Sequence, residues 1–169
     1  MLLKVNGLIK EAIAQKNQPV DLLMLLTPEL SAQLSNESSL KLVEEQIGCK
    51  IWPGFQYETR KELPDDINAI RAIKYQSARG LEGWTTFCLN FDQYYTNLIN
   101  HLNSEYNSLE SKVLSRDEWV ASEANRWLLM IFTRSIDTIV IHFENKNSVI
   151  YQTLESFSRN YPDYIYLDA

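Results

Sequence analysis

The chain has 169 residues, of which 45% are hydrophobic, 11% aromatic and 22% charged. This size and apolar content fit one compact domain, residues 1–169, and leave little chain for a second core. The formal net charge of −6 argues against a broad basic face for nucleic acid, because neutralising phosphates requires clustered Lys and Arg. The sequence has no apolar run that approaches the length of roughly 20 residues needed to span a bilayer. It also begins without a signal-peptide pattern. We therefore expect a soluble, cytoplasmic protein without a membrane partner.

Hydrophobic spacing predicts alternating helices and strands at the start of the chain. Apolar residues at helical intervals indicate an amphipathic helix over 5–14, which Pro19 cannot continue. The run VDLLMLLTP, residues 20–28, is typical of a strand that is buried on both faces of a parallel sheet. A single helix is expected over 29–47, and Gly48 is suited to end it.

The rest of the chain continues this alternation. A polar stretch with Pro53, Gly54 and Pro64 predicts an exposed connection. The elements expected after Gly48 are a short strand over 49–52, strands over 67–75 and 85–91 around a glycine-containing turn, helices over 94–116 and from Glu118, a strand over 135–143 and a helix over 149–157. This pattern predicts an α/β fold with a mostly parallel sheet and helices on both faces. Functional residues are then expected directly after strands, at their carboxyl ends.

Several common kinds of site have no signature in the sequence. The five glycines form neither a Gly-x4-Gly-Lys-Ser/Thr phosphate loop nor a dinucleotide-binding fingerprint. Cys49 and Cys88 are isolated in apolar contexts, which is typical of buried thiols. His101 and His142 have no Cys or carboxylate at ligand spacing, which is typical of structural histidines. We expect no metal site and no complete nucleotide cradle within the chain.

Residues 76–91 and 124–143 carry the most specific pattern in the chain. The first segment, QSARGLEGWTTFCLNF, is similar to motif V of superfamily I DNA helicases of the UvrD, Rep and PcrA type, H-x-S/A-K-G-L-E before a hydrophobic strand. Gln76 replaces the His of that motif and Arg79 replaces the Lys. The second segment, ANRWLLMIFTRSIDTIVIHF, resembles motif VI, L-L-Y-V-A-L-T-R-A-x-x-x-L-V-I, more closely. Two such matches in the family's order, each beside a strand, are hard to obtain by chance.

The resemblance implies a C-terminal RecA-like helicase domain, a three-layer P-loop NTPase-like fold that lacks its own phosphate loop. Residues 20–34 occupy the place of motif IV, but Leu26, Thr27 and Pro28 stand where the family usually has an arginine that reaches ATP. The family also often inserts a large subdomain between motifs IV and V, whereas this chain has only the connection that follows Trp52.

The resemblance also assigns roles to residues of both motifs. Arg134 is expected to be the catalytic arginine finger and to contact the nucleotide, because a guanidinium stabilises the charge that develops in phosphoryl transfer. The other expected contacts are Gly80 and Glu82 with the nucleotide, and Gln76, Ser77 and Arg79 with nucleic acid. ATP with Mg²⁺ would be bound mainly by an N-terminal RecA-like helicase domain, in the same chain or in a separate subunit. Single-stranded DNA would be the second partner.

The sequence leaves alternatives open for these residues and for the whole chain. Arg134 can instead form a surface salt bridge with Asp137 or Glu123. The chain can also be a stand-alone helicase-like remnant that acts as a non-catalytic interaction or regulatory module, or an accessory that supplies Arg134 to a separate motor in trans. Four aromatic residues can either stack on unpaired bases or pack in the core, namely Trp52, Phe55, Tyr57 and Trp84.

Overall fold

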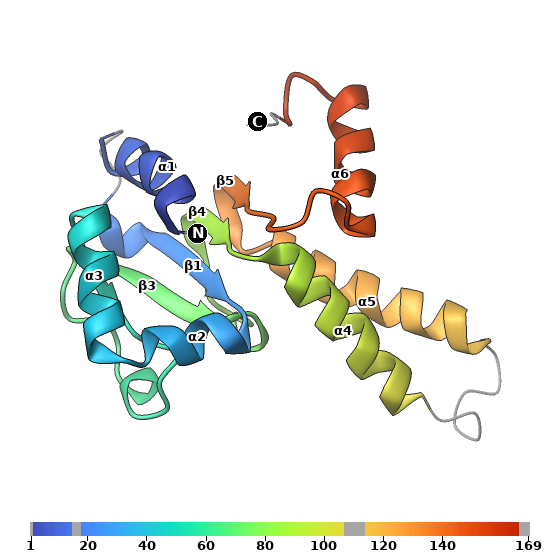
Figure 1. Ribbon diagram of the computed structural model, residues 1–169, viewed down its shortest axis with the longest axis horizontal. Coiled ribbons are helices and arrows are strands. Elements are labelled where there is room, and N and C mark those ends of the chain that lie inside the picture. Colours follow the sequence, from blue (N-terminus) through green and yellow to red (C-terminus); the bar gives the residue numbers. More distant parts are fainter. Residues whose placement is uncertain (1, 15–17, 107–113, 166–169) are drawn as a thin grey trace.

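A five-stranded parallel sheet organises the chain, as shown in Figure 1. The computed structural model describes residues 2–14, 18–106 and 114–165. Within these residues the strand order is β2-β3-β1-β4-β5. The strands are β1 Leu22–Leu26, β2 Lys50–Trp52, β3 Ala69–Lys74, β4 Gly83–Cys88 and β5 Ser135–Ile141. The predicted α/β fold with a parallel sheet is therefore confirmed.

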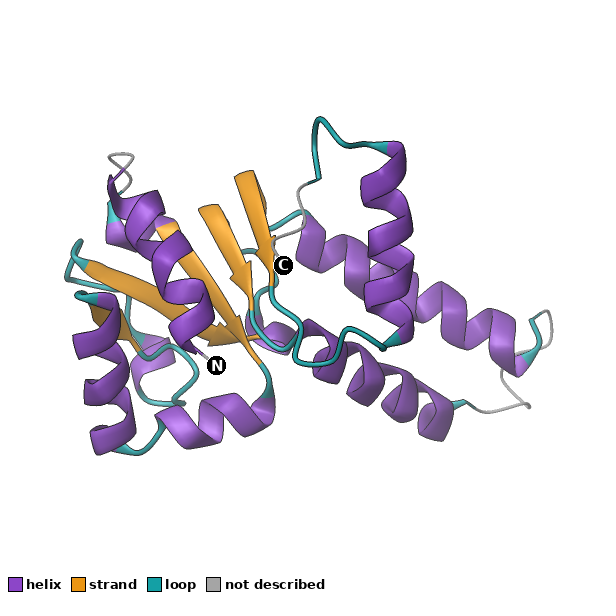
Figure 2. Cartoon of the chain, turned by 45° about the horizontal axis from the view of Figure 1, so that its top comes forward, coloured by secondary structure: helices purple, strands orange, loops and turns teal. Residues whose placement is uncertain are grey.

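Helices cover both faces of the sheet and give the fold three layers (Figure 2). One core contains side chains of α1 Leu2–Ala14, α2 Pro28–Leu34 and α3 Glu37–Ile47. The other core contains side chains of α4 Phe91–Glu105, α5 Arg116–Phe132 and α6 Val149–Asn160. Three short 3₁₀ helices lie in connections, η1 Pro19–Asp21, η2 Thr59–Lys61 and η3 Tyr75–Ser77. The arrangement agrees with the RecA-like three-layer fold predicted from the sequence.

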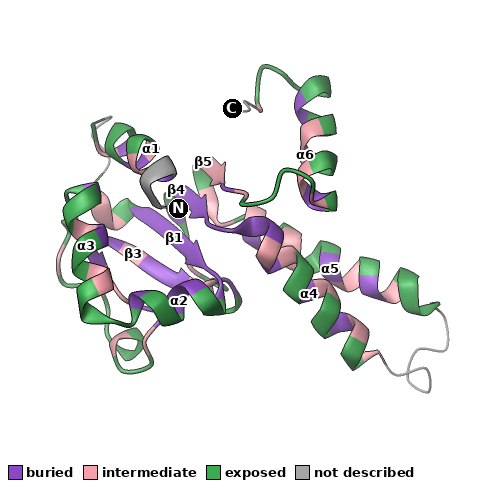
Figure 3. Cartoon of the chain, in the orientation of Figure 1, coloured by how far each residue is buried: buried purple, intermediate pink, exposed green. Residues whose placement is uncertain are grey.

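Strand β1 joins the two cores, because its side chains alternate between the faces of the sheet. Leu22, Met24 and Leu26 pack in the core of α1, α2 and α3, whereas Leu23 and Leu25 pack in the core of α4, α5 and α6. All five side chains are buried, as Figure 3 shows for the centre of the sheet. A continuous apolar run is the pattern that such a doubly covered strand requires.

The helix expected over 29–47 is wrong in one respect, because the chain forms two helices there. α2 ends at Leu34, and the side chain of Asn36 begins α3 by accepting hydrogen bonds from the backbone N–H groups of Ser38 and Ser39, at 3.0 and 3.2 Å. A side-chain cap of this kind favours the start of a new helix over the continuation of the preceding one. The predicted end at Gly48 is confirmed by its left-handed φ of 75°.

The second half of the chain differs from the prediction mainly at element boundaries. The strand expected over 85–91 starts two residues earlier and ends three residues earlier, and Phe91 already begins α4. Asn90, with a left-handed φ of 51°, makes the turn between them. Of the helix expected over 94–116, α4 accounts for the part up to Glu105, and residues 107–113 lie outside the described residues. α4 and α5 project together away from the sheet in Figure 1.

The outer strand β5 contains one extra residue relative to its neighbour β4. Gly83 pairs with Ser135 and Thr85 pairs with Thr138, so two steps on β4 correspond to three on β5. Asp137 within this bulge is exposed. A bulge and a charged residue both hinder further strand pairing, so this edge of the sheet is protected from growing by another strand.

We predict that Leu25→Ala lowers the free energy of unfolding by about 2–5 kcal/mol, because it removes a fully buried side chain from the central strand. Leu42→Ala on α3 is the matched control, since Leu42 is 58% exposed and its truncation should change stability by less than about 0.5 kcal/mol. Denaturant unfolding of both variants measures the difference. Equal losses in the two variants would contradict the central position of β1.

Candidate functional site

The connection from β3 to β4, residues 75–82, crosses the sheet. β3 and β4 are both parallel to β1, which lies between them, so the connection must return from the carboxyl end of β3 to the amino end of β4. Tyr75 and Ala78 are buried against the face that carries α4 and α5. We call residues 75–82 the crossover. It contains no α-helix, unlike the usual β-α-β connection.

The crossover separates the predicted site residues between two edges of the sheet. Gln76 and Ser77 directly follow β3, at the carboxyl edge, as expected. Gly80 and Glu82 directly precede β4, and Arg134 directly precedes β5, at the amino edge. These three residues precede strands, whereas functional residues were expected to follow them. The crossover carries Gly80 and Glu82 back to the amino edge, and α5 returns the chain to that edge before Arg134.

Arg134 is held between the end of α5 and the crossover. Its Nε donates to the carbonyl oxygen of Met130 at 2.8 Å, its Nη1 to that of Leu81 at 3.3 Å, and its Nη2 to the hydroxyl of Thr133 at 3.1 Å. The backbone carbonyl of Arg134 in turn accepts from the N–H of Gly83 at 2.9 Å. The motif V and motif VI segments, far apart in the sequence, therefore meet at this residue.

The salt-bridge alternative for Arg134 does not match the structure. Glu123 pairs with Arg126 at 2.8 Å, and the carboxylate of Asp137 accepts from the hydroxyl of Thr138 at 2.7 Å. Among the described residues, Arg134 has no ion-pair partner. Its half-buried guanidinium is bonded to neutral oxygens instead.

Arg71 is a second half-buried guanidinium at the amino edge, and the sequence analysis did not single it out. Its Nε donates to the carbonyl oxygen of Val20 at 2.6 Å and its Nη2 to that of Glu82 at 2.7 Å. Burial lowers the pKa of Arg71 from its ordinary value, and the nearby carboxylate of Asp21 acts in the opposite direction. The available signal was a lone charged residue in the otherwise apolar strand AIRAIK.

The last residues of the crossover are fixed by their backbone rather than by their side chains. Gly80 has a φ of 81°, a left-handed conformation that favours glycine, and no atom lies within 4 Å of the Cβ position it lacks. The carboxylate of Glu82 is exposed, while its backbone carbonyl is bound by Arg71. The segment Gly80–Glu82 therefore has an exposed carboxylate, an unobstructed glycine and two backbone carbonyls that are bonded to arginines.

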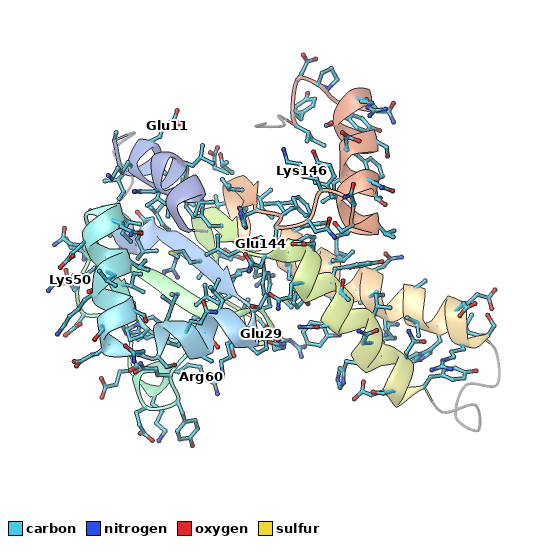
Figure 4. The ribbon with its side chains drawn as sticks, in the orientation of Figure 1. Glu11, Glu29, Lys50, Arg60, Glu144 and Lys146 are labelled. Carbon is cyan, nitrogen blue, oxygen red and sulfur yellow. The ribbon has the colours of Figure 1, made fainter. Side chains whose placement is uncertain are left out.

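The carboxyl edge places Gln76 and Ser77 beside the connection from β2 to β3. The Nη1 of Arg60 donates to the hydroxyl of Ser77 at 2.9 Å, and Figure 4 labels Arg60 on this connection, below α2 in that view. Gln76 is exposed and Ser77 half-buried, and Arg79, further along the crossover, is also exposed. Gln76 and Arg79 are therefore accessible to a polar ligand, while the hydroxyl of Ser77 is bonded to Arg60.

The four aromatic candidates separate by burial. Phe55 is buried and Trp52 is half-buried against the core, so the stacking alternative is wrong for Phe55. Tyr57 is 68% exposed, with the ammonium group of Lys61 4.1 Å from its ring centre, and Trp84 is 46% exposed at the start of β4. Only Tyr57 and Trp84 present substantial ring surface to solvent.

The cysteines and histidines occupy structural positions. Cys88 is fully buried, and burial raises the pKa of its thiol, whereas Cys49 is only half-buried, so the expectation of two buried thiols is wrong for Cys49. His101 pairs with Glu105 on α4 at 3.3 Å. His142 lies just after β5, where its Nδ1 accepts from the backbone N–H of Asn90 at 3.4 Å. The described residues contain no cluster of three or more potential metal ligands.

Comparison of the chain with protein-family models, curated proteins and solved structures finds no match. In the described part of the chain, each helix is too short or too polar to cross a membrane. The function proposed below therefore rests on the two sequence motifs and on the contacts that join them.

We predict that Gly83→Ala destabilises the amino edge, because a Cβ at this position would lie 2.7 Å from the Cβ of Leu23 and 3.2 Å from the carbonyl oxygen of Asp21. The expected loss in the free energy of unfolding is about 1–3 kcal/mol. Gly7→Ala in α1 is the control, since that site has open space and a helical glycine replaced by alanine gains up to about 1 kcal/mol. Thermal or denaturant unfolding should give opposite signs for the two variants; the same sign would contradict the close approach at Gly83.

Proposed function

We propose that this chain is the second RecA-like motor domain of an ATP-dependent superfamily I DNA helicase. Its role is to supply an arginine finger and one wall of the cleft for ATP and single-stranded DNA. The observation that carries the proposal is the hydrogen bond of 3.3 Å from Arg134 to the carbonyl of Leu81, which joins the segments that resemble motifs V and VI. A shared site is the arrangement that two cooperating motifs require.

The amino edge has the chemical groups that the nucleotide side of such a cleft needs. Arg134 offers a cation for a γ-phosphate, and the exposed carboxylate of Glu82 can accept hydrogen bonds from ribose hydroxyls. Gly80 leaves space beside the backbone for close approach. Because the sequence has no phosphate loop, ATP with Mg²⁺ would be held mainly by an N-terminal RecA-like domain. The bound ATP and Mg²⁺ would supply the phosphoryl-transfer chemistry.

The described contacts of Arg134 support a role as a cation that is positioned before a ligand binds. Three of its five N–H groups are bonded to oxygens of this domain, which fixes the direction of the guanidinium. The remaining N–H groups can donate to an incoming anion without dismantling those bonds. A guanidinium fixed before the reaction stabilises developing negative charge with little reorganisation.

Contacts with single-stranded DNA are assigned to the first part of the crossover, from the carboxyl edge to Arg79. Gln76, Ser77 and Arg79 offer an amide, a hydroxyl and a guanidinium on one short segment. The chain's charge of −6 limits these contacts to a local site. The crossover therefore carries both the proposed DNA-side residues and the proposed nucleotide-side residues on one short segment.

A non-catalytic interaction or regulatory module is the second candidate. It is favoured by Leu26, Thr27 and Pro28 at the end of β1, where the resemblance leads one to expect an arginine. The first experiment is to measure the native polypeptide by immunoblot of source-cell lysate. A band far heavier than 19.7 kDa supports a motor domain within a longer helicase. A band at that mass, without a co-purifying subunit that has a phosphate loop, favours the module and rejects the motor.

We predict that Arg134→Ala in the complete native protein lowers kcat for DNA-stimulated ATP hydrolysis by roughly 10³–10⁵-fold, the range typical of arginine fingers. Arg126→Ala is the control, because Arg126 is exposed on α5 and pairs only with Glu123 in the described structure. Steady-state ATPase assays give kcat and KM for both variants. An Arg134→Ala protein with unchanged kcat would rule out the finger.

A further inference from the structure

Two guanidinium groups converge on consecutive backbone carbonyls of the crossover. Arg134 donates to the carbonyl of Leu81 at 3.3 Å, and Arg71 donates to the carbonyl of Glu82 at 2.7 Å. The two arginines come from β3 and from the turn before β5, so only the tertiary fold brings them to the same short segment.

Neither cation is neutralised by an ion pair. Both side chains are half-buried, and all five ion pairs among the described residues involve other groups. Two carboxylates lie in the neighbourhood, but Asp21 and Glu82 are both exposed and neither is within ion-pair distance of these arginines. Partly burying a charge without a partner is unfavourable. A net acidic chain thus keeps two half-buried guanidinium groups, without an ion pair among the described residues, bonded to consecutive residues of one segment.

The two arginines retain donors for a ligand. Each guanidinium has five N–H groups. The described bonds engage two of them on Arg71 and three on Arg134. Planar guanidinium groups of this kind bind phosphate oxygens in bidentate fashion. The open space beside Gly80 lies on the same segment.

We propose that Arg71 and Arg134 together form an oligophosphate site on the segment Gly80–Glu82, in which Arg71 is the second binding cation. Identifying the natural ligand as the phosphate chain of a nucleoside triphosphate rests on the proposed function. The site itself rests only on the contacts of the two arginines. Arg71 would then bind phosphate in addition to linking the carbonyls of Val20 and Glu82.

The test is binding of inorganic tripolyphosphate to the chain itself, by isothermal titration calorimetry at constant ionic strength. Arg71→Gln and Arg134→Gln should each raise the Kd at least tenfold, because each removes one cation from the site. Arg71→Lys should raise it less, since it retains the charge but loses the bidentate geometry. Arg159→Gln on α6 is the control and should leave the Kd unchanged, because Arg159 is exposed and pairs with Glu155 at 3.2 Å.

A purely structural role for Arg71 predicts a different result. Arg71→Gln would then lower the melting temperature and leave tripolyphosphate affinity equal to that of the parent chain. That outcome overturns the proposal, as does the absence of tripolyphosphate binding by the parent chain.

A measurement on the unaltered chain covers the case in which Arg71→Gln fails to fold. The ¹⁵Nε–¹Hε resonances of Arg71 and Arg134 should both move during tripolyphosphate titration and report the same Kd. Resonances that stay in place, or that give different Kd values, would also reject a shared site.

The anion site and the helicase proposal can fail independently of each other. Tripolyphosphate binding that depends on both arginines, together with ATPase activity that is insensitive to Arg134→Ala, would retain the anion site and reject the motor. Loss of ATPase activity in Arg134→Ala without an effect of Arg71→Gln on tripolyphosphate binding would do the reverse.

Discussion

The crossover of residues 75–82 is the constraint on which the candidate site depends. Parallel strands β3 and β4 have β1 between them, so a short segment without an α-helix must travel from one edge of the sheet to the other. Its buried residues, Tyr75 and Ala78, are fixed on the core of α4 and α5. The ends of the crossover therefore have defined positions at opposite edges of the sheet.

At the amino edge, backbone carbonyls of the crossover accept hydrogen bonds from two arginine side chains. The carbonyls of Leu81 and Glu82 directly precede β4, and Gly83 at the start of that strand packs closely on Leu23 of β1. Hydrogen bonds to carbonyls hold a guanidinium in place without cancelling its charge. Arg71 and Arg134 are thus directed by neutral oxygens and have no ion pair among the described residues, which is the arrangement that recognition of an anion needs.

Both ends of the crossover are held by side-chain hydrogen bonds. The amino edge combines the two arginines, the backbone bond between Gly83 and Arg134 and the packing of Gly83. At the carboxyl edge, the buried hydroxyl of Tyr75 donates to the carbonyl oxygen of Leu89 at 2.9 Å, and Arg60 makes an exposed contact with Ser77. An exposed hydrogen bond contributes little net stability, so the buried bond of Tyr75 is the stronger anchor at this edge.

The sequence by itself determined the layer architecture, because local patterns report burial and helix ends directly. The continuous apolar run of β1 required a sheet covered on both faces, and Gly48 marked the end of α3. The two motif segments also indicated the candidate site residues, whose roles stay predictions. Only the tertiary structure decided which candidates meet, because that depends on strand order and side-chain contacts, which local periodicity does not encode. For the same reason Arg71, an isolated charge in a strand, became a candidate only when β4 brought Glu82 to it.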